Sequence, residues 1–272
     1  MVKEKVALSY LAFILATGLY LVVGPGGLLH KDSWYESLKA YVGESEGSSL
    51  YASFVLVIGP SIAFALIYHL LGGLFGGLNT LIVGTAALFF AFGREDFPTL
   101  SQRFLSRVSA GDHQGGAMIL EESGVKIAAE DADEFADQAS EFFLHMAMRR
   151  WFGPAIYFVL LGPVAAVAYR LVMMAENTVS PVPTIAVRLI DWLPSRLLAV
   201  SFAIIGDAEQ TAGVIKNRAL DFDDDPAEFL SDACRKSSET AELPEPRLKR
   251  AFKVLENSLY AWLAVISLVT LI

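Results

Sequence analysis

Apolar residues gather in long blocks along this chain instead of alternating with polar residues. Four blocks cover residues 6–23, 54–71, 74–92 and 152–174. A helix rises about 1.5 Å per residue, so roughly 20 apolar residues cross the hydrocarbon core of a bilayer, which is about 30 Å thick. The blocks approach or meet that length. Because lipid offers no hydrogen-bond partner to an open strand edge, the pattern predicts an all-α membrane protein.

Two further apolar stretches are less regular. Residues 259–272 are short and are expected to form the last membrane helix. Residues 185–205 hold Arg188, Asp191 and Arg196, and charges at membrane depth are costly unless they are paired. This stretch is either a broken or re-entrant helix lining a polar cavity, or a span packed on its neighbours. The sequence therefore predicts a polytopic helical membrane protein with about five or six membrane helices.

A glycine-rich turn separates the second and third blocks. Residues 72–77 place Gly72 four positions before Gly76, a spacing that lets helix backbones approach closely in lipid. The turn predicts a tight membrane hairpin and is compatible with a homo-oligomer. Before it, Trp34 and Lys39 belong to a segment expected to lie on the membrane surface.

The first polar stretch, residues 94–150, predicts a helical insertion. Its apolar residues recur at helical spacing around Phe104, Gly111 breaks the pattern, and a second helix is expected over residues 117–122. Acidic residues at 130–134 favour the start of a third helix, which should continue through Arg149 into the next span.

Positive residues near span ends place both polar stretches in the cytoplasm and leave the orientation of the first helix open. Five segments are expected. They are the N-terminal membrane helices with the glycine-rich hairpin (1–93), the polar helical insertion (94–150), a motif-bearing membrane hairpin (151–206), a polar segment that is acidic and then basic (207–258), and a C-terminal membrane helix (259–272).

Composition and charge narrow the function. Hydrophobic residues make up 54% of the chain and the mean hydropathy is +0.47, too apolar for an ordinary soluble domain. The net charge of −9 argues against a nucleic-acid partner. The single cysteine, Cys234, excludes an internal disulfide.

Catalytic motifs are missing from the sequence in usable form: nucleophile elbows, paired zinc histidines, Cys-x-x-Cys pairs and phosphate loops. We therefore assign no catalytic residue, metal ligand or cofactor. The aspartates at 221–225 lack the ligand spacing of a calcium loop, which favours a solvated turn before a helix start at Pro226.

Charged residues in the second half form the candidate site. Gly162 and Pro163 should bend their span, and Arg170, Asp191 and Arg196 could then converge. One interpretation is a buried ion pair of Asp191 with Arg170 or Arg196. The other is an anion-binding pocket for phosphate, a nucleotide or a carboxylate. The candidate ligand-binding residues are Arg149, Arg150, Arg170, Asp191, Arg196, Glu95 and Asp96, and the candidate structural residues are Gly72, Gly76, Gly162, Pro163, Trp192 and Pro194.

The order of three motifs resembles a known family. The chain reads WF-x-P at 151–154, LLGP-x-x-A-x-x-YR at 160–170 and DWLP-x-RL at 191–197. This order resembles the AmpE membrane proteins, which belong with the CobD/CbiB cobalamin-assembly proteins. The stretch GREDFPTL at 93–100 is similar to the polar loop of AmpE proteins, so the resemblance covers roughly residues 93–207.

The resemblance implies a multi-pass protein of the bacterial inner membrane with a regulatory or sensory role in cell-wall recycling and β-lactamase induction. Its partners would be the lipid bilayer and a cytoplasmic protein or an anionic small ligand. Cobalamin synthases carry Glu-Asn and then Asp-Gly before the LLGP span, whereas this chain reads HMAMRR at 145–150, which argues against ligase activity. The alternative is a membrane enzyme related to the cobalamin-assembly amide synthases. It would use Glu95, Asp96, Glu121 and Glu122 with Mg²⁺ to bind a nucleotide or phosphate substrate.

Overall fold

Every regular element in the part of the chain that the structure describes is a helix, as predicted. The structure is a computed structural model, and it describes residues 2–23, 32–44, 49–92, 97–123, 131–176, 183–238 and 244–271. The chain divides into two compact units. Unit 1 comprises residues 1–94, 149–191 and 265–272, and unit 2 comprises residues 95–148 and 192–264.

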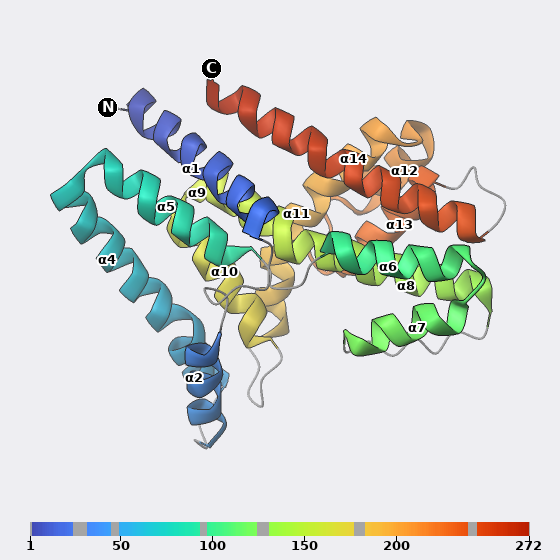
Figure 1. Cartoon of the computed structure of the whole chain (residues 1–272), viewed down its shortest axis with the longest axis horizontal. Helices are drawn as coiled ribbons and strands as arrows, with labels where there is room; N and C mark the ends of the chain where they lie inside the picture. Colours follow the sequence, from blue (N-terminus) through green and yellow to red (C-terminus); the bar gives the residue numbers. More distant parts are fainter. Residues whose placement is uncertain are drawn as a thin grey trace. The chain divides into compact units, whose positions relative to one another are not determined.

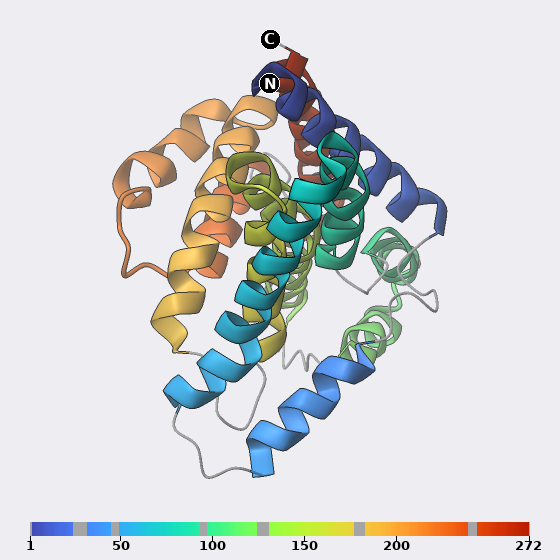
Figure 2. The ribbon, with the colours of Figure 1, turned by 90° about the vertical axis from the view of Figure 1, so that its left-hand side faces the viewer.

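Unit 1 is built around a helical hairpin. Its two arms are α4 (Gly59–Phe75) and α5 (Gly77–Ala91), joined at Gly76, whose φ of +54° suits a residue without a Cβ. The predicted tight hairpin is confirmed (Figures 1 and 2). Helix α1 (Val2–Val23) packs on α5, so α5 lies between α1 and α4 (Figure 1).

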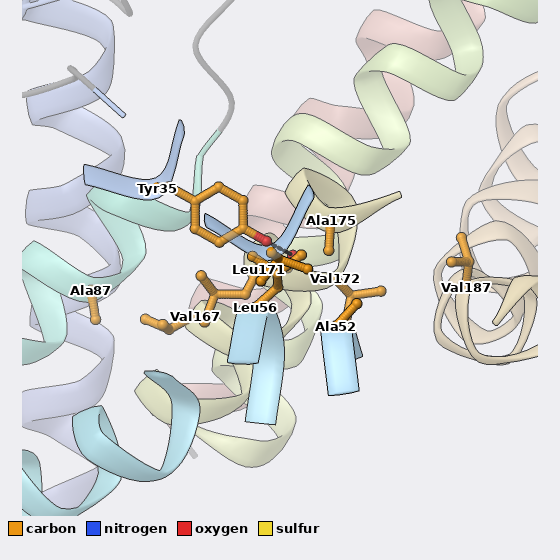
Figure 3. Close-up of a cluster of buried hydrophobic side chains, with 10 residues drawn as sticks. Tyr35, Ala52, Leu56, Ala87, Val167, Leu171, Val172, Ala175 and Val187 are labelled. Carbon is orange, nitrogen blue, oxygen red and sulfur yellow. Dashed lines mark hydrogen bonds between the residues drawn. The ribbon is translucent and has the colours of Figure 1, made fainter. Parts of the chain in front are cut away.

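Unit 1 contains further helical elements. They are α2 (Ser33–Glu44), α3 (Ser49–Ser53), the π-helical turn η2 (Phe54–Ile58), all but the first residue of the π-helical turn η3 (Met148–Phe152), α9 (Gly153–Leu161), α10 (Pro163–Ala175) and the first part of α11 (Thr184–Ile205). Helix α10 packs on both arms of the hairpin, and α9 packs on α5. The buried core contains Tyr35, Leu56, Val167 and Leu171 (Figure 3). The Tyr35 hydroxyl donates to the carbonyl of Leu171 at 3.1 Å, which ties α2 to α10.

The predicted bend at Gly162 and Pro163 is confirmed. Helix α9 ends at Leu161, Gly162 has a φ of +90°, and Pro163 is the first residue of α10. A residue with a Cβ is strained at such a φ, and proline at a first helical position loses no hydrogen bond. The two residues thus divide one apolar block into two helices.

Unit 2 contains the three helices predicted for the first polar stretch. They are α6 (Phe97–Ser109), α7 (His113–Glu122) and α8 (Ala132–Ala147). The α8 start is capped by Asp131, whose side chain accepts from the backbone N–H of Glu134 at 2.8 Å. The remaining elements are the second part of α11, α12 (Ala208–Arg218), α13 (Pro226–Ser238) and most of α14 (Pro244–Leu271).

Aromatic rings fill the core of unit 2. The ring centroid of Phe143 on α8 lies 5.1 Å from that of Phe104 on α6 and 4.8 Å from that of Phe252 on α14. Such pairs stabilise beyond their buried area. The Phe143 side chain is fully buried.

Helix α14 begins earlier than the sequence suggests. The sequence predicts a polar segment up to residue 258 and a helix from residue 259, but the helix starts at Pro244 and packs Leu248 and Phe252 into the unit 2 core. Proline suits a first helical position, and the charged residues Lys249, Arg250 and Lys253 are exposed on the outer face of an amphipathic helix. A search for apolar blocks alone missed this half of the helix.

Helix α11 is continuous from Thr184 to Ile205 with Pro194 inside it, so the broken-helix interpretation of this stretch is wrong. Two helices among the described residues are long and apolar enough to cross a membrane: Leu50–Gly72, with a mean hydropathy of 2.2, and Leu248–Leu268, with 1.2. Three shorter apolar helices are Ala7–Val23, Gly77–Ala91 and Pro163–Ala175. The expected five or six membrane helices stay a prediction.

Candidate functional site

Arg149 is the centre of a buried polar cluster in unit 1. The helical run through η3 places its side chain between two carboxylates. Its Nε donates to Oδ2 of Asp191 at 2.6 Å, while Nη1 and Nη2 both donate to Glu176, the latter at 3.3 Å. Only 20% of the Arg149 side chain and 2% of the Asp191 side chain are exposed. The arginine therefore holds the start of α11 and the end of α10 together.

Asp191 uses its second oxygen as well. Oδ1 accepts from the hydroxyl of buried Tyr169 at 2.8 Å. Tyr157 stacks on Tyr169 with ring centroids 5.2 Å apart and donates to the carbonyl of Ile190 at 2.8 Å. A Cβ on Gly153 would lie 2.5 Å from the Tyr169 hydroxyl oxygen, so only glycine admits the tyrosine at this approach.

The cluster corrects one detail of the predicted ion pair. Asp191 was expected to pair with Arg170 or Arg196, yet the strong contact comes from Arg149, which has the closer approach through η3. Arg170 lies within 3.6 Å of Asp32, the residue before α2, and both side chains are largely buried. The Arg149–Asp191 pair, in which both carboxylate oxygens accept hydrogen bonds from protein groups, fixes a packing arrangement and leaves little capacity for a ligand.

Arg196 belongs to unit 2, where it braces the connection between α12 and α13. Its Nη2 donates to the carbonyl of Asp221 at 3.0 Å and contacts Oδ2 of Asp224 at 3.4 Å. The guanidinium carbon stands 4.1 Å from the ring centroid of Phe229. The residues predicted to converge are thus divided between the two units.

Arg218 completes this second cluster. It donates to Asp224 through Nε at 3.0 Å and also contacts Asp232, and the hydrogen bond to Asp224 raises the pKa of its guanidinium. The side chain of Asp224 is only 9% exposed. The expected solvated turn is therefore wrong for this aspartate, because two arginines neutralise it. The expected helix start at Pro226 is confirmed, with Asp225 accepting from the N–H of Ala227 at 2.8 Å.

The other predicted residues have structural surroundings or lie outside the description. Arg150 is half-buried in η3, Trp192 stacks on Phe222 with centroids 4.6 Å apart, and the Gly72 carbonyl accepts from the N–H of Gly76 at 3.0 Å. Glu95 and Asp96 lie outside the described residues. Among the described residues no group of three or more histidine, cysteine, aspartate or glutamate side chains could hold a metal ion.

A polar cavity between α6 and α7 was missed by the sequence analysis. Its volume is about 530 Å³. Arg103 pairs with Glu122 at 3.4 Å and Arg107 with Asp112 at 3.1 Å, and all four side chains are well exposed. The sequence feature that could have indicated this cavity is the spacing of Arg103 and Arg107, which lie four residues apart on one helix face. Their partners depend on how α7 folds back at Gly111, which the spacing does not reveal.

An apolar groove lies in unit 1 among α2, α4, α5 and α10. Its volume is about 260 Å³ and its walls include Trp34, Phe64, Phe90 and Leu171. The residues that line it come from four helices distant in the chain.

No protein-family model, curated protein or solved structure matches this chain. The resemblance to AmpE proteins therefore rests on the three motifs and the 93–100 stretch. Two of the motif residues, Tyr169 and Asp191, meet in the unit 1 cluster.

Proposed function

We propose that the chain is a multi-pass protein of the bacterial inner membrane, of the AmpE type, with a regulatory or sensory role. One observation carries the membrane placement. Large aliphatic side chains are exposed at every fourth residue from Ile58, the last residue of η2, along α4: Ile58, Ile62, Leu66 and Leu70 are 46%, 51%, 60% and 70% exposed.

This stripe supports a lipid-facing surface. Side chains four apart lie on one face of a helix, so the four residues form a continuous apolar strip roughly 18 Å long. Soluble monomers rarely expose such contiguous patches, whereas lipid accepts them without cost. Exposed Leu15 on α1, Ile82 on α5 and Leu161 on α9 extend the apolar surface of unit 1.

The polar clusters support regulation over catalysis. Arg149 and Asp191 are hydrogen-bonded to each other, and Asp191 also accepts from Tyr169. Arg196 donates to the backbone carbonyl of Asp221. These side chains therefore have little hydrogen-bonding capacity left for a substrate. Exposed ion pairs contribute about 0–1 kcal/mol, so a ligand can open those of the α6–α7 cavity at small cost. In this proposal the cavity is where unit 2 receives an anionic ligand or a segment of a cytoplasmic partner.

The enzyme alternative retains one supporting observation. Glu122, one of the acids that would serve Mg²⁺ there, lines the same cavity. A Mg²⁺-nucleotide bound at this position would have Arg103 and Arg107 near its phosphates and Glu122 near the metal.

Membrane placement is tested by extracting cell membranes with alkaline carbonate. The proposal expects the full chain to stay in the membrane pellet and to leave it only with detergent. Release into the carbonate supernatant would contradict the membrane placement, and with it the AmpE-type role.

The choice between regulator and enzyme is tested on detergent-purified protein. The melting temperature is measured with muropeptides, with nucleotides in the presence and absence of Mg²⁺, and with cobalamin precursors, because a ligand of the folded state raises it. We expect a muropeptide to raise it in the wild type and not in Arg107→Gln, with the exposed Arg235→Gln as the matched control. A rise caused only by Mg²⁺-nucleotide, and lost on Asp96→Ala, would favour the enzyme.

A further inference from the structure

We infer that the apolar groove of unit 1 binds one acyl chain of a membrane phospholipid. This inference rests on the proposed membrane placement. The floor of the groove consists of the buried side chains of Ala87, Val167 and Leu171, and its sides include Phe64 and Phe90.

The chemistry of the walls selects an apolar occupant. A bound water needs two to four polar partners, and the side chains that line this groove are all apolar or aromatic. Roughly 260 Å³ left empty would forfeit the contact energy of every wall atom. The lining of the groove therefore favours a hydrocarbon occupant.

The position of the groove selects a lipid as the source of that hydrocarbon. On α5 the exposed Ile82 lies four residues before the groove residue Ala86, so both lie on one face of the helix. The groove therefore adjoins apolar surface of α5 that is proposed to face lipid. An acyl chain can enter it sideways from the bilayer without crossing water.

One end of the groove has the features of the membrane interface. Trp34 lines that end, 47% exposed, with its ring centroid 6.4 Å from that of Phe90. Tryptophan prefers the level of the headgroups. The exposed ring of Trp34 therefore marks the end of the slot that faces the lipid headgroups.

The length of the groove fits part of a chain. From Val83 to Phe90, α5 advances about 10 Å, roughly a third of the hydrocarbon core. The slot therefore holds the segment of the acyl chain next to the headgroup, and the rest of the chain continues along the lipid-facing helices.

The test is native mass spectrometry of the full-length protein released from detergent micelles. We expect the wild type to retain one phospholipid. Ala86→Phe places a ring in the groove from an exposed wall position, and we expect about tenfold lower retention, because the lipid loses the burial of about two methylenes. Ile82→Phe is the matched control, since Ile82 is on the same helix, exposed and outside the groove, and it should retain the lipid.

A second measurement covers a failure of Ala86→Phe to fold, which its melting curve would reveal. In vesicles containing a phosphatidylcholine brominated in its acyl chains, emission from a variant with Trp34 as its sole tryptophan should be quenched more strongly than from the same protein with the smaller substitution Ala86→Leu.

Equal lipid retention by the wild type and both single variants would overturn the inference, as would a lipid-free dimer abolished by Ala86→Phe, which would assign the groove to a second copy. In either case a chain that resists carbonate extraction would leave the proposed membrane function standing. Release of the chain by carbonate would contradict both the proposed membrane function and the lipid-binding groove.

Discussion

At the scale of single residues, Asp191 is the side chain on which the polar contacts of unit 1 converge. Arg149 and Tyr169 each bond one of its oxygens. Leaving one charge of a buried ion pair without its partner destabilises a protein by about 3–5 kcal/mol. The role of the residue in the DWLP motif is then to hold helices together.

Replacing Asp191 by alanine should lower the free energy of unfolding by about 3–5 kcal/mol, because the guanidinium of Arg149 loses a buried partner. Chemical denaturation in detergent measures this loss. Glu176→Gln is the control: its side chain is 33% exposed, and the effect should be smaller. A wild-type denaturation midpoint for Asp191→Ala would refute the structural role.

Gly153→Ala should destabilise unit 1 by about 1–3 kcal/mol, because the added methyl group would meet the Tyr169 hydroxyl and ring edge. The same change in a Tyr169→Ala background should cost less, since the hydroxyl oxygen and Cζ, which would each lie 2.5 Å from the added methyl carbon, are gone. A double-mutant cycle on unfolding free energies measures the difference. Strict additivity would show that the two residues do not share the contact.

Cys234 on α13 gives a prediction about pH. Burial raises the pKa of its thiol to about 12, whereas the thiol of an unfolded cysteine has a pKa of about 8.5. The unfolded state therefore releases this proton first, and the wild type should lose stability relative to Cys234→Ala as pH rises above about 8.5. Melting temperatures of both proteins between pH 7 and 10 test this. A constant difference would contradict it.

At the scale of elements, the sequence predicted where helix α8 starts and where α9 and α10 divide, because local chemistry determines both. It did not predict which side chains pair across the fold. Asp131, Gly162 and Pro163 act within one helical turn of themselves, so the sequence predicted their effects correctly. The partner of Asp191 could not be predicted, because Arg149 is 42 residues away and reaches it only through the packing of η3. The first half of α14 was missed because its apolar positions are interrupted by charges.

The connection between α12 and α13 should depend on Arg196. Arg196→Ala removes the donors to the Asp221 carbonyl and to Asp224, so amide hydrogen exchange in residues 219–225 should speed up by about tenfold or more. Exchange mass spectrometry measures this. Arg235→Ala, which removes an exposed pair with Asp232, should leave the rates unchanged. Unaltered exchange in Arg196→Ala would mean that Arg218 alone holds the connection.

At the scale of the whole molecule, the chain forms two compact units that each hold most of one helix long and apolar enough to cross a membrane. Helices α11 and α14 each contribute residues to both units, so the boundaries fall inside helices where no linker composition marks them. The hydropathy pattern could indicate which stretches are apolar. It could not reveal which faces stay exposed after packing, and that exposure is what supports the membrane placement.

The central claim is that the exposed stripe on α4 faces lipid. Spin labels placed singly at residues 58–70 of the protein in vesicles, with Cys234 replaced by alanine, report collisions with oxygen, which enters lipid, and with a polar nickel complex, which does not. The account predicts high oxygen and low nickel accessibility at Ile58, Ile62, Leu66 and Leu70, and high nickel accessibility at the exposed position 114 on α7. Nickel accessibility along α4 equal to that at position 114 would contradict it.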